Sequence, residues 1–392
     1  MISNRFAALG AAAALALGTA APASAADEIR IGMITTLSGS GAGLGIDIRD
    51  GFALALEQLG GSLGGLPATV IEGDDERKPD VAVQLASRMI ERDEVDVVTG
   101  IVWSNLALAL MPTVQRNEVF FLSPNAGPSQ LAGAQCSPWF FNVAFQNDGQ
   151  HEAMGQHVQD AGYESVYLLA PNYPAGQDSL TGFKRYYEGE IVGEVYTQIG
   201  QLDYAAEIAA LRAADPDAVF FFYPGGMGIN FVKQYAQAGL KGEIPLFGPG
   251  FSFSQDILAA VGEAALGVAN SAQWSPDLDI PENREFVASF EEKYGRLPSL
   301  YAAQGYEAAL LLDSAVAAVE GAIEDKDAFR AALQAADFTS VRGDFSFGNN
   351  HYPIQDYYLR EVVQDDEGRI TNRLVSTIFE DHVDAYAADC PL

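Results

Sequence analysis

The feature that most constrains the fold of this chain is a repeated alternation of short apolar segments with longer segments of helical periodicity. Strand candidates occupy residues 28–37, 67–75, 95–102 and 119–125, and the stretches between them space their apolar side chains as helices do. The strand candidates are mostly apolar without alternation, which is typical of strands that are buried on both faces. This order predicts a parallel sheet with helices on both sides.

The same order starts again after about residue 150. Further strand candidates lie at 165–173, 191–197, 217–225 and 244–251, and a strand-rich tail closes the chain after two long helical segments. The chain has 392 residues, which is enough for two ordinary domains with separate cores. We therefore predict an α/β protein of two doubly wound parallel-sheet lobes.

Residues 1–25 are typical of a secretory signal peptide. Arg5 precedes the apolar run "FAALGAAAALALG", and small residues stand at Ala23 and Ala25. The run is shorter than the roughly 20 apolar residues that span a bilayer, which disfavours the alternative of an uncleaved anchor. We predict cleavage after Ala25 and export to the periplasm.

Export has a consequence for the only two cysteines, Cys136 and Cys390. An oxidising compartment favours a disulfide between them, which would hold the C-terminus against the body of the protein. Two free buried thiols are the alternative, because the sequence alone does not show that the two residues are close in space.

Charge and motif content exclude several classes of function. The formal net charge of −31, from 22 basic and 53 acidic residues, argues against a nucleic-acid or anionic-lipid partner. The four histidines and two cysteines show no metal-ligand spacing, and no Walker A or G-x-S-x-G motif occurs. We expect no metal, no cofactor and no enzymatic activity; a secreted enzyme is the alternative from another class.

Polar and aromatic residues gather where the strand candidates end. These ends read "VWSN", "LSPNAG", "APNYPAG", "FYPGG" and "FGPGF". Ligands of open parallel sheets bind beyond the carboxyl ends of the strands, where loops lead into helices. Two lobes that both carry such residues at their strand ends suggest a binding cleft between them.

Four stretches of the sequence together resemble the type I periplasmic solute-binding proteins of the leucine/isoleucine/valine-binding family. They are residues 31–45, 214–226, 238–250 and 294–312. The resemblance implies two lobes with three hinge crossings, near Phe145, Trp274 and His351. The lobes would close on a small solute and deliver it to an ABC permease. The implied N-terminal lobe comprises 26–145 and 275–351, the C-terminal lobe comprises 146–274 and 352–392, and we expect a monomer.

The resemblance also implies where the solute's carboxylate is held. A serine at the start of the helix after the "TG" strand matches Ser104, with Trp103 shaping the wall, and the following loop matches Asn125, Ala126 and Gly127. The first turn of a helix has unpaired N–H groups and a positive dipole end, which independently favours an anion. The alternative is that Ser104 is only a helix cap.

The chain departs from the amino-acid binders of this family at one place. They carry an acidic residue after the second-lobe "GP", whereas "FGPGF" at 247–251 has none. A buried ammonium without a partner is heavily penalised, so we expect a ligand without one. A branched-chain or other aliphatic acid or amino acid, bound without that acid, is the alternative, and a periplasmic sensor is another.

Aromatic residues stand where the ammonium site would be. Tyr173, Tyr223 and Phe251 lie at second-lobe strand ends, Phe145 lies at the first crossing, and Leu44 replaces an aromatic of the amino-acid binders. Residues 136–148 and 170–178 resemble the subgroup that binds benzoate and hydroxybenzoates. Aromatic walls suit a flat ring, although each of these side chains could instead belong to the core.

Overall fold

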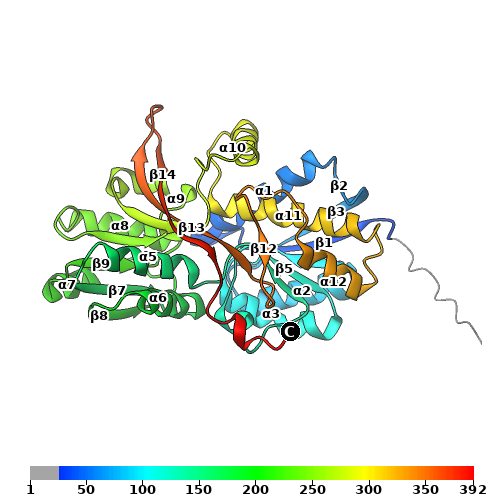
Figure 1. The fold of residues 1–392 in the computed structure, drawn as a ribbon, viewed down its shortest axis with the longest axis horizontal. Coiled ribbons are helices and arrows are strands. Elements are labelled where there is room, and N and C mark those ends of the chain that lie inside the picture. The colour runs from blue at the N-terminus through cyan, green and yellow to red at the C-terminus, as the bar shows by residue number, and fades with distance from the viewer. Residues whose placement is uncertain (1–25) are drawn as a thin grey trace, which may run out of the picture.

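The computed structural model describes residues 26–392, so the predicted signal peptide lies outside the described part of the chain. The described residues form two α/β lobes that lie side by side along the long axis of the molecule (Figure 1). The predicted fold class is confirmed.

The first lobe contains a six-stranded sheet in the order β2-β3-β1-β4-β5-β6. All neighbours are parallel except the short hairpin of β2 and β3. Its strands are β1 (Ile29–Thr35), β2 (Ser62–Leu63), β3 (Leu66–Asp74), β4 (Val97–Thr99), β5 (Phe120–Ser123) and β6 (Phe140–Asn142). Its helices are α1 (Ala42–Gln58), α2 (Pro79–Glu91), α3 (Ser104–Asn117), α4 (Ser129–Ala132), α10 (Pro281–Tyr294), α11 (Leu300–Ala318) and α12 (Lys326–Ala335), with the 3-10 turn η1 (Gly39–Gly41).

The packing of β5 shows why these strands are apolar without alternation. Phe120 and Leu122 belong to a core that they share with α1, α11 and α12, whereas Phe121 points into the core formed with α2 and α3. All three are nearly inaccessible to solvent. Because successive side chains of a strand point to opposite faces, a sheet covered on both faces buries every residue of the strand.

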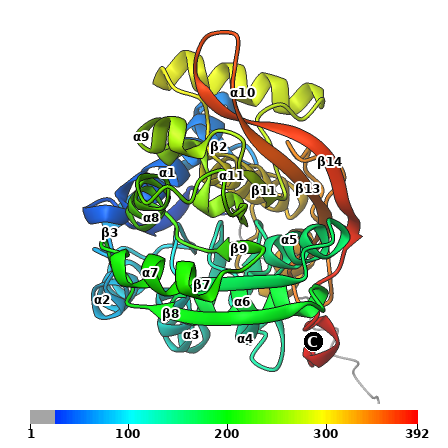
Figure 2. The same ribbon diagram turned by 90° about the vertical axis from the view of Figure 1, so that its left-hand side faces the viewer.

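The second lobe contains an eight-stranded sheet in the order β12-β13-β11-β10-β9-β7-β8, with β14 paired to β13. Its strands are β7 (Ser165–Pro171), β8 (Glu190–Thr197), β9 (Ala218–Phe221), β10 (Leu246–Pro249), β11 (Ala269–Ala272), β12 (Ser346–Phe347), β13 (Pro353–Gln364) and β14 (Ile370–His382). Its helices are α5 (Gly149–Asp160), α6 (Pro174–Tyr186), α7 (Ala205–Ala214), α8 (Gly226–Gln237) and α9 (Gln255–Val261), with η2 (Gly250–Ser252) and η3 (Gly262–Ala265). The strand-rich tail is the antiparallel β13–β14 hairpin, which rises beside α10 (Figure 2).

Two glycines allow helices to start directly beside a strand end. A Cβ on Gly45 would lie 2.1 Å from the carbonyl oxygen of Thr36, and one on Gly176 would lie 1.8 Å from that of Pro171. Neither position has room for a side chain, because the obstructing atoms are backbone atoms. The glycines therefore bring the first turns of α1 and α6 close to the ends of β1 and β7, at the cleft side of each lobe.

The chain leaves the first sheet after β6, leaves the second sheet after β11 for helices of the first lobe, and joins the second sheet again at β12. The tail differs from the predicted range 352–392 for the C-terminal lobe. Beyond β14 the chain returns to the first lobe, where Cys390 is bonded to Cys136 with a Cα–Cα distance of 5.6 Å. The predicted disulfide is thus present. Asn350 Nδ2 also donates a hydrogen bond to Asp384, which lies in the segment between β14 and Cys390. The tail, which includes the turn η4 (Ala387–Asp389), links both lobes.

Within residues 26–392, no helix combines the length and the hydropathy that crossing a bilayer requires.

Candidate functional site

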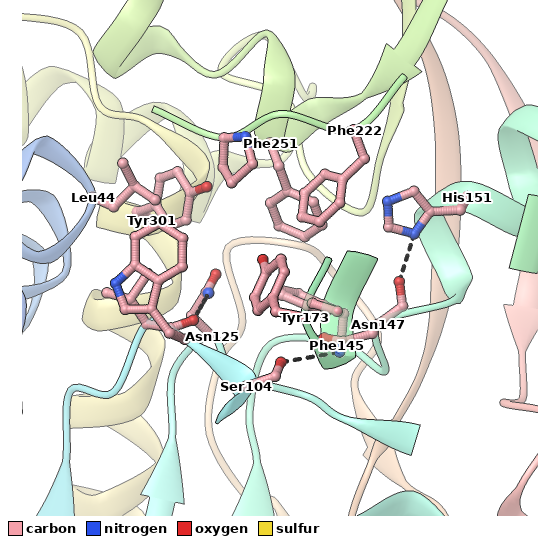
Figure 3. A pocket seen from close by; sticks show the side chains of 14 residues that line it. Leu44, Ser104, Asn125, Phe145, Asn147, His151, Tyr173, Phe222, Phe251 and Tyr301 are labelled. Atoms are coloured by element: carbon pink, nitrogen blue, oxygen red, sulfur yellow. Dashed lines mark hydrogen bonds between the residues drawn. The ribbon is translucent and has the colours of Figure 1, made fainter. Parts of the chain in front are cut away.

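A cavity lies between the two lobes and encloses about 340 Å3 of empty space, part of it open to solvent. Fourteen residues line it (Figure 3): Leu44, Val102, Trp103, Ser104, Asn125, Phe145, Asn147, His151, Tyr173, Ala175, Phe222, Pro224, Phe251 and Tyr301.

Most of the lining residues come from the ends of strands, as the parallel topology predicts. Trp103 and Ser104 follow β4, Tyr173 follows β7, and Phe222 and Phe251 follow β9 and β10. Seven of the ten residues predicted for the site line this cavity: Leu44, Trp103, Ser104, Asn125, Phe145, Tyr173 and Phe251. Residues far apart in the sequence are therefore brought to one place by the two sheets.

Ser104 is the first residue of α3 and not its cap. Trp103 holds the N-cap position with an extended backbone, and no side chain caps the helix. The Ser104 hydroxyl oxygen accepts a hydrogen bond from Asn147 Nδ2 at 3.1 Å, so the hydroxyl hydrogen is free to be donated to a ligand. The amides of Ser104 and Asn105 belong to the first turn, where no helix carbonyl is available to them. An anion is thus favoured beside Ser104.

Trp103 forms one wall of the cavity, and contacts with Thr36 and Arg77 fix the position of its ring. Its indole Nε1 donates to Thr36 Oγ1 at 2.8 Å, and the Arg77 guanidinium lies 5.6 Å from its ring centre. Arg77 also donates to Ser40 at the edge of the cleft. Thr36 in turn donates to the buried carboxylate of Asp75 at 2.7 Å, so the Trp103 ring is fixed by a chain of hydrogen bonds on the side away from the cavity.

Asn147 connects the site to the contact between the lobes. One hydrogen of its Nδ2 goes to Ser104 in the first lobe, and the other goes to Asp178 of α6 in the second lobe at 2.8 Å. Asp178 also accepts from the Ser129 amide at 3.1 Å and from the Ser129 hydroxyl at 2.7 Å. The same carboxylate therefore joins α4 of one lobe to α6 of the other beside the cavity.

The loop after β5 does not present the groups that were predicted for a carboxylate. The amide of Ala126 donates to the carbonyl of Ile101, and the amide of Gly127 donates to Asn147 Oδ1 at 3.2 Å. Neither residue lines the cavity. Asn125 does; one hydrogen of its Nδ2 is donated to the Val102 carbonyl at 2.7 Å, and its Oδ1 has no partner among the described residues. The loop shapes the site and leaves one unpartnered acceptor, Asn125 Oδ1, in its lining.

Tyr223 also lies away from the cavity. Its ring packs against Tyr204 and Phe231 in the core of the second lobe, and its hydroxyl is hydrogen-bonded to Thr197 at 3.1 Å. The neighbouring Phe222 takes the place that the sequence suggested for Tyr223. Successive side chains at the end of a strand point to opposite sides. An error of one residue in the predicted register therefore assigns a core side chain to the cavity and a cavity side chain to the core.

Aromatic rings enclose most of the space. Seven lining residues carry one: Trp103, Phe145, His151, Tyr173, Phe222, Phe251 and Tyr301. Their centres are spaced closely, with 4.8 Å between Phe145 and Phe251 and 6.1 Å between Trp103 and Tyr173. Burial raises the pKa of Tyr173 and of Tyr301, so both hydroxyls keep their hydrogens at neutral pH. The walls suit a flat, apolar body with a few polar substituents.

Four lining residues that carry polar or aromatic groups were not predicted: Asn147, His151, Phe222 and Tyr301. Burial lowers the pKa of His151 to about 3, so this histidine is neutral at physiological pH. Its Nδ1 lies 2.7 Å from the carbonyl oxygen of Asn147. Asn147 lies at the first hinge crossing and His151 lies at the start of α5. Because a hinge crossing passes beside the cleft, this position in the sequence was the signal that could have identified both residues as candidates for the site.

None of the fourteen lining side chains carries a carboxylate, an ammonium or a guanidinium group, and the one titratable base, His151, is neutral at physiological pH. The part of the chain that the structure describes also contains no cluster of three or more His, Cys, Asp or Glu side chains arranged to hold a metal ion. A ligand ammonium would have no carboxylate partner in this cavity, whereas a carboxylate would meet the start of α3.

Comparison with known proteins agrees with this geometry. The sequence profile of the periplasmic binding proteins matches residues 28–368. The chain belongs to the periplasmic binding protein family. This solute-binding protein is also 27% identical to "Leu/Ile/Val-binding protein homolog 6" of Brucella melitensis, over 91% of this chain and 93% of the relative.

Two solved structures are similar to this periplasmic binding protein over nearly its whole length. A solute-binding protein of an ABC transporter from R. palustris, in complex with benzoate, is 32% identical with a TM-score of 0.88 and covers 93% of this chain and 100% of its own. Another, from Rhodopseudomonas palustris BisB5 in complex with 3,4-dihydroxybenzoic acid, is 30% identical with a TM-score of 0.85 and covers 92% and 99%. Family and neighbours are solute-binding proteins and not enzymes.

Proposed function

We propose that this periplasmic binding protein captures a small aromatic carboxylate, of the benzoate and hydroxybenzoate type, and delivers it to an ABC permease. The observation that carries the proposal is the cavity itself, in which the first turn of α3 and the Ser104 hydroxyl face a cage of seven rings. The absence of a carboxylate from the lining disfavours an amino acid, because its ammonium would be buried without a counter-charge.

Relatives support the same proposal. The benzoate and dihydroxybenzoate complexes are 32% and 30% identical to this chain, and the relative named for leucine, isoleucine and valine is 27% identical. A branched-chain acid or amino acid remains the second candidate because of that relative. Export, cleavage after Ala25, action as a monomer and partnership with a permease complete the proposal. The mass of the secreted protein tests the cleavage site.

A thermal-shift panel tests the ligand class. Benzoate and hydroxybenzoates should raise the melting temperature, while leucine, isoleucine and valine should not. A ligand at about 100 times its Kd adds about 2.7 kcal/mol to the free energy of unfolding. A variant with a filled cavity, Ala175→Phe, should fold but lose the shift, because Ala175 lines the site. Stabilisation by leucine and by no aromatic acid would refute the proposal.

A further inference from the structure

Two buried side chains of the cavity end in acceptor atoms that have no partner. Asn125 is 7% exposed and His151 is 1% exposed, and both line the cavity. Asn125 Oδ1 and His151 Nε2 make no hydrogen bond with any described residue. A buried polar atom without a partner is costly, and its presence in a binding site points to a group that the ligand supplies.

The orientation of the Asn125 amide follows from its hydrogen bond. The group 2.7 Å from Asn125 Nδ2 is the carbonyl oxygen of Val102, which can only accept. The nitrogen must therefore face Val102, and the oxygen is left toward the ligand. Turning the amide over would set two oxygens against each other, so the unpartnered atom of Asn125 is its oxygen, which is an acceptor.

The position of the ring hydrogen of His151 follows from a hydrogen bond in the same way. Its Nδ1 lies 2.7 Å from the carbonyl oxygen of Asn147 and must donate to it. The ring is neutral at physiological pH, since burial lowers its pKa to about 3. Nε2 then carries a lone pair and no hydrogen. Phe222, whose ring centre is 5.1 Å away, and Phe251, at 6.1 Å, hold the imidazole in position (Figure 3).

Donors and acceptors are thus separated within the cavity. The Ser104 hydroxyl and the first amides of α3 are donors, which suit a carboxylate. Asn125 Oδ1 and His151 Nε2 would repel the carboxylate oxygens and need a hydrogen from another part of the ligand. Benzoate has no such hydrogen, whereas a phenolic hydroxyl on the same ring has one.

We propose that the ligand is a ring-hydroxylated aromatic acid, and that Asn125 and His151 accept hydrogen bonds from its hydroxyl groups. This inference rests on the proposed function, because it takes the carboxylate to lie at the start of α3. It adds that Asn125 and His151 determine the preference for hydroxylated over unsubstituted rings. A site whose buried polar atoms need a ligand hydroxyl discriminates strongly against an analogue that lacks it.

Calorimetric titration of the unmodified protein tests this preference first. The ligands are benzoate, 3-hydroxybenzoate, 4-hydroxybenzoate, 3,4-dihydroxybenzoate and 4-methoxybenzoate, with leucine as the amino-acid arm. At least one hydroxylated acid should bind about tenfold or more tightly than benzoate. The methoxy acid should gain nothing, because it keeps the oxygen and lacks the hydrogen. Benzoate binding as tightly as every hydroxylated acid would overturn the inference and leave the proposed function standing.

Two variants then test the residues. His151→Phe and Asn125→Leu remove one acceptor each, and at least one should bring the preference for the hydroxylated acid to within about threefold of unity. The control His157→Phe makes the same change on the same helix, outside the cavity lining, and should keep the preference. A preference that survives in both variants would also overturn the inference. If leucine binds and no aromatic acid does, the proposed function itself fails, and the inference fails with it.

Discussion

Replacing Ser104 with alanine separates a role in ligand binding from a role in the fold. The Ser104 hydroxyl accepts from Asn147 and has its hydrogen available for the ligand. Its loss removes one hydrogen bond to a charged group, which is worth about 1.5–3 kcal/mol, or roughly ten- to a hundredfold in Kd. The neutral amide of the same acid should bind weakly to the parent protein and lose less on mutation.

The effect of Ser104→Ala on stability should be small. One Asn147 hydrogen loses its acceptor, while the other still bonds to Asp178, so the cost is about 1 kcal/mol. Ser123→Ala is a matched control: the Ser123 hydroxyl is fully buried and donates to the Ala126 carbonyl at 2.8 Å, but Ser123 does not line the cavity. Calorimetry and thermal unfolding of both variants separate the two effects. If Ser104→Ala binds the acid as tightly as the parent does, the carboxylate lies elsewhere.

Three further predictions address the disulfide, the histidines and the contact between the lobes. Cys136 and Cys390 are 254 residues apart in sequence, so the double variant Cys136→Ser/Cys390→Ser should lower the free energy of unfolding by about 4–5 kcal/mol; equal denaturant midpoints would contradict this. Burial lowers the pKa of His151 to about 3 and that of His351 to about 4, so the unfolded chain binds protons near pH 6.5 that the folded chain does not. The contribution of these histidines to stability therefore falls as the pH drops from 6.5 toward 4, opposed by Asp148 and Asp256, whose pKa values burial raises. His351→Phe should lose less stability over this range than the parent does, whereas an equal change in both proteins would show that His351 takes up its proton in the folded state. Asp178 accepts two hydrogen bonds from Ser129 across the lobes, so Asp178→Ala should weaken ligand binding about tenfold and reduce the compaction measured by small-angle scattering; unchanged values of both would remove its role in closure.

The sequence was sufficient for the fold and for the strand ends that form the site. Continuous apolar runs such as that at Phe120–Leu122 indicate strands buried on both faces, and parallel strands place their carboxyl ends at one edge. This is why Trp103, Ser104 and Tyr173 could be placed at one site although they lie on different strands and lobes.

The details that failed depend on hydrogen bonds that only the folded chain defines. The direction of the Asn125 amide is set by the carbonyl of Val102, and the amide of Gly127 is taken by Asn147. Neither partner is recognisable from sequence spacing. His151 was examined only for metal-ligand spacing, which was not found, and its unpartnered Nε2 can be recognised only in the folded chain. Tyr223 was predicted for the site in place of Phe222 because the prediction was displaced by one residue. A continuous apolar run does not show which of two neighbouring side chains faces the cavity.

The most direct test of the central claim is a crystal structure of this protein with 4-hydroxybenzoate. We predict the carboxylate within hydrogen-bond distance of the Ser104 hydroxyl and the first amides of α3. The ring should lie between Tyr173, Phe145 and Phe251, where the rings of both lobes meet. A carboxylate bound beside His151 or Asn125, or a ligand outside this cavity, would contradict this prediction.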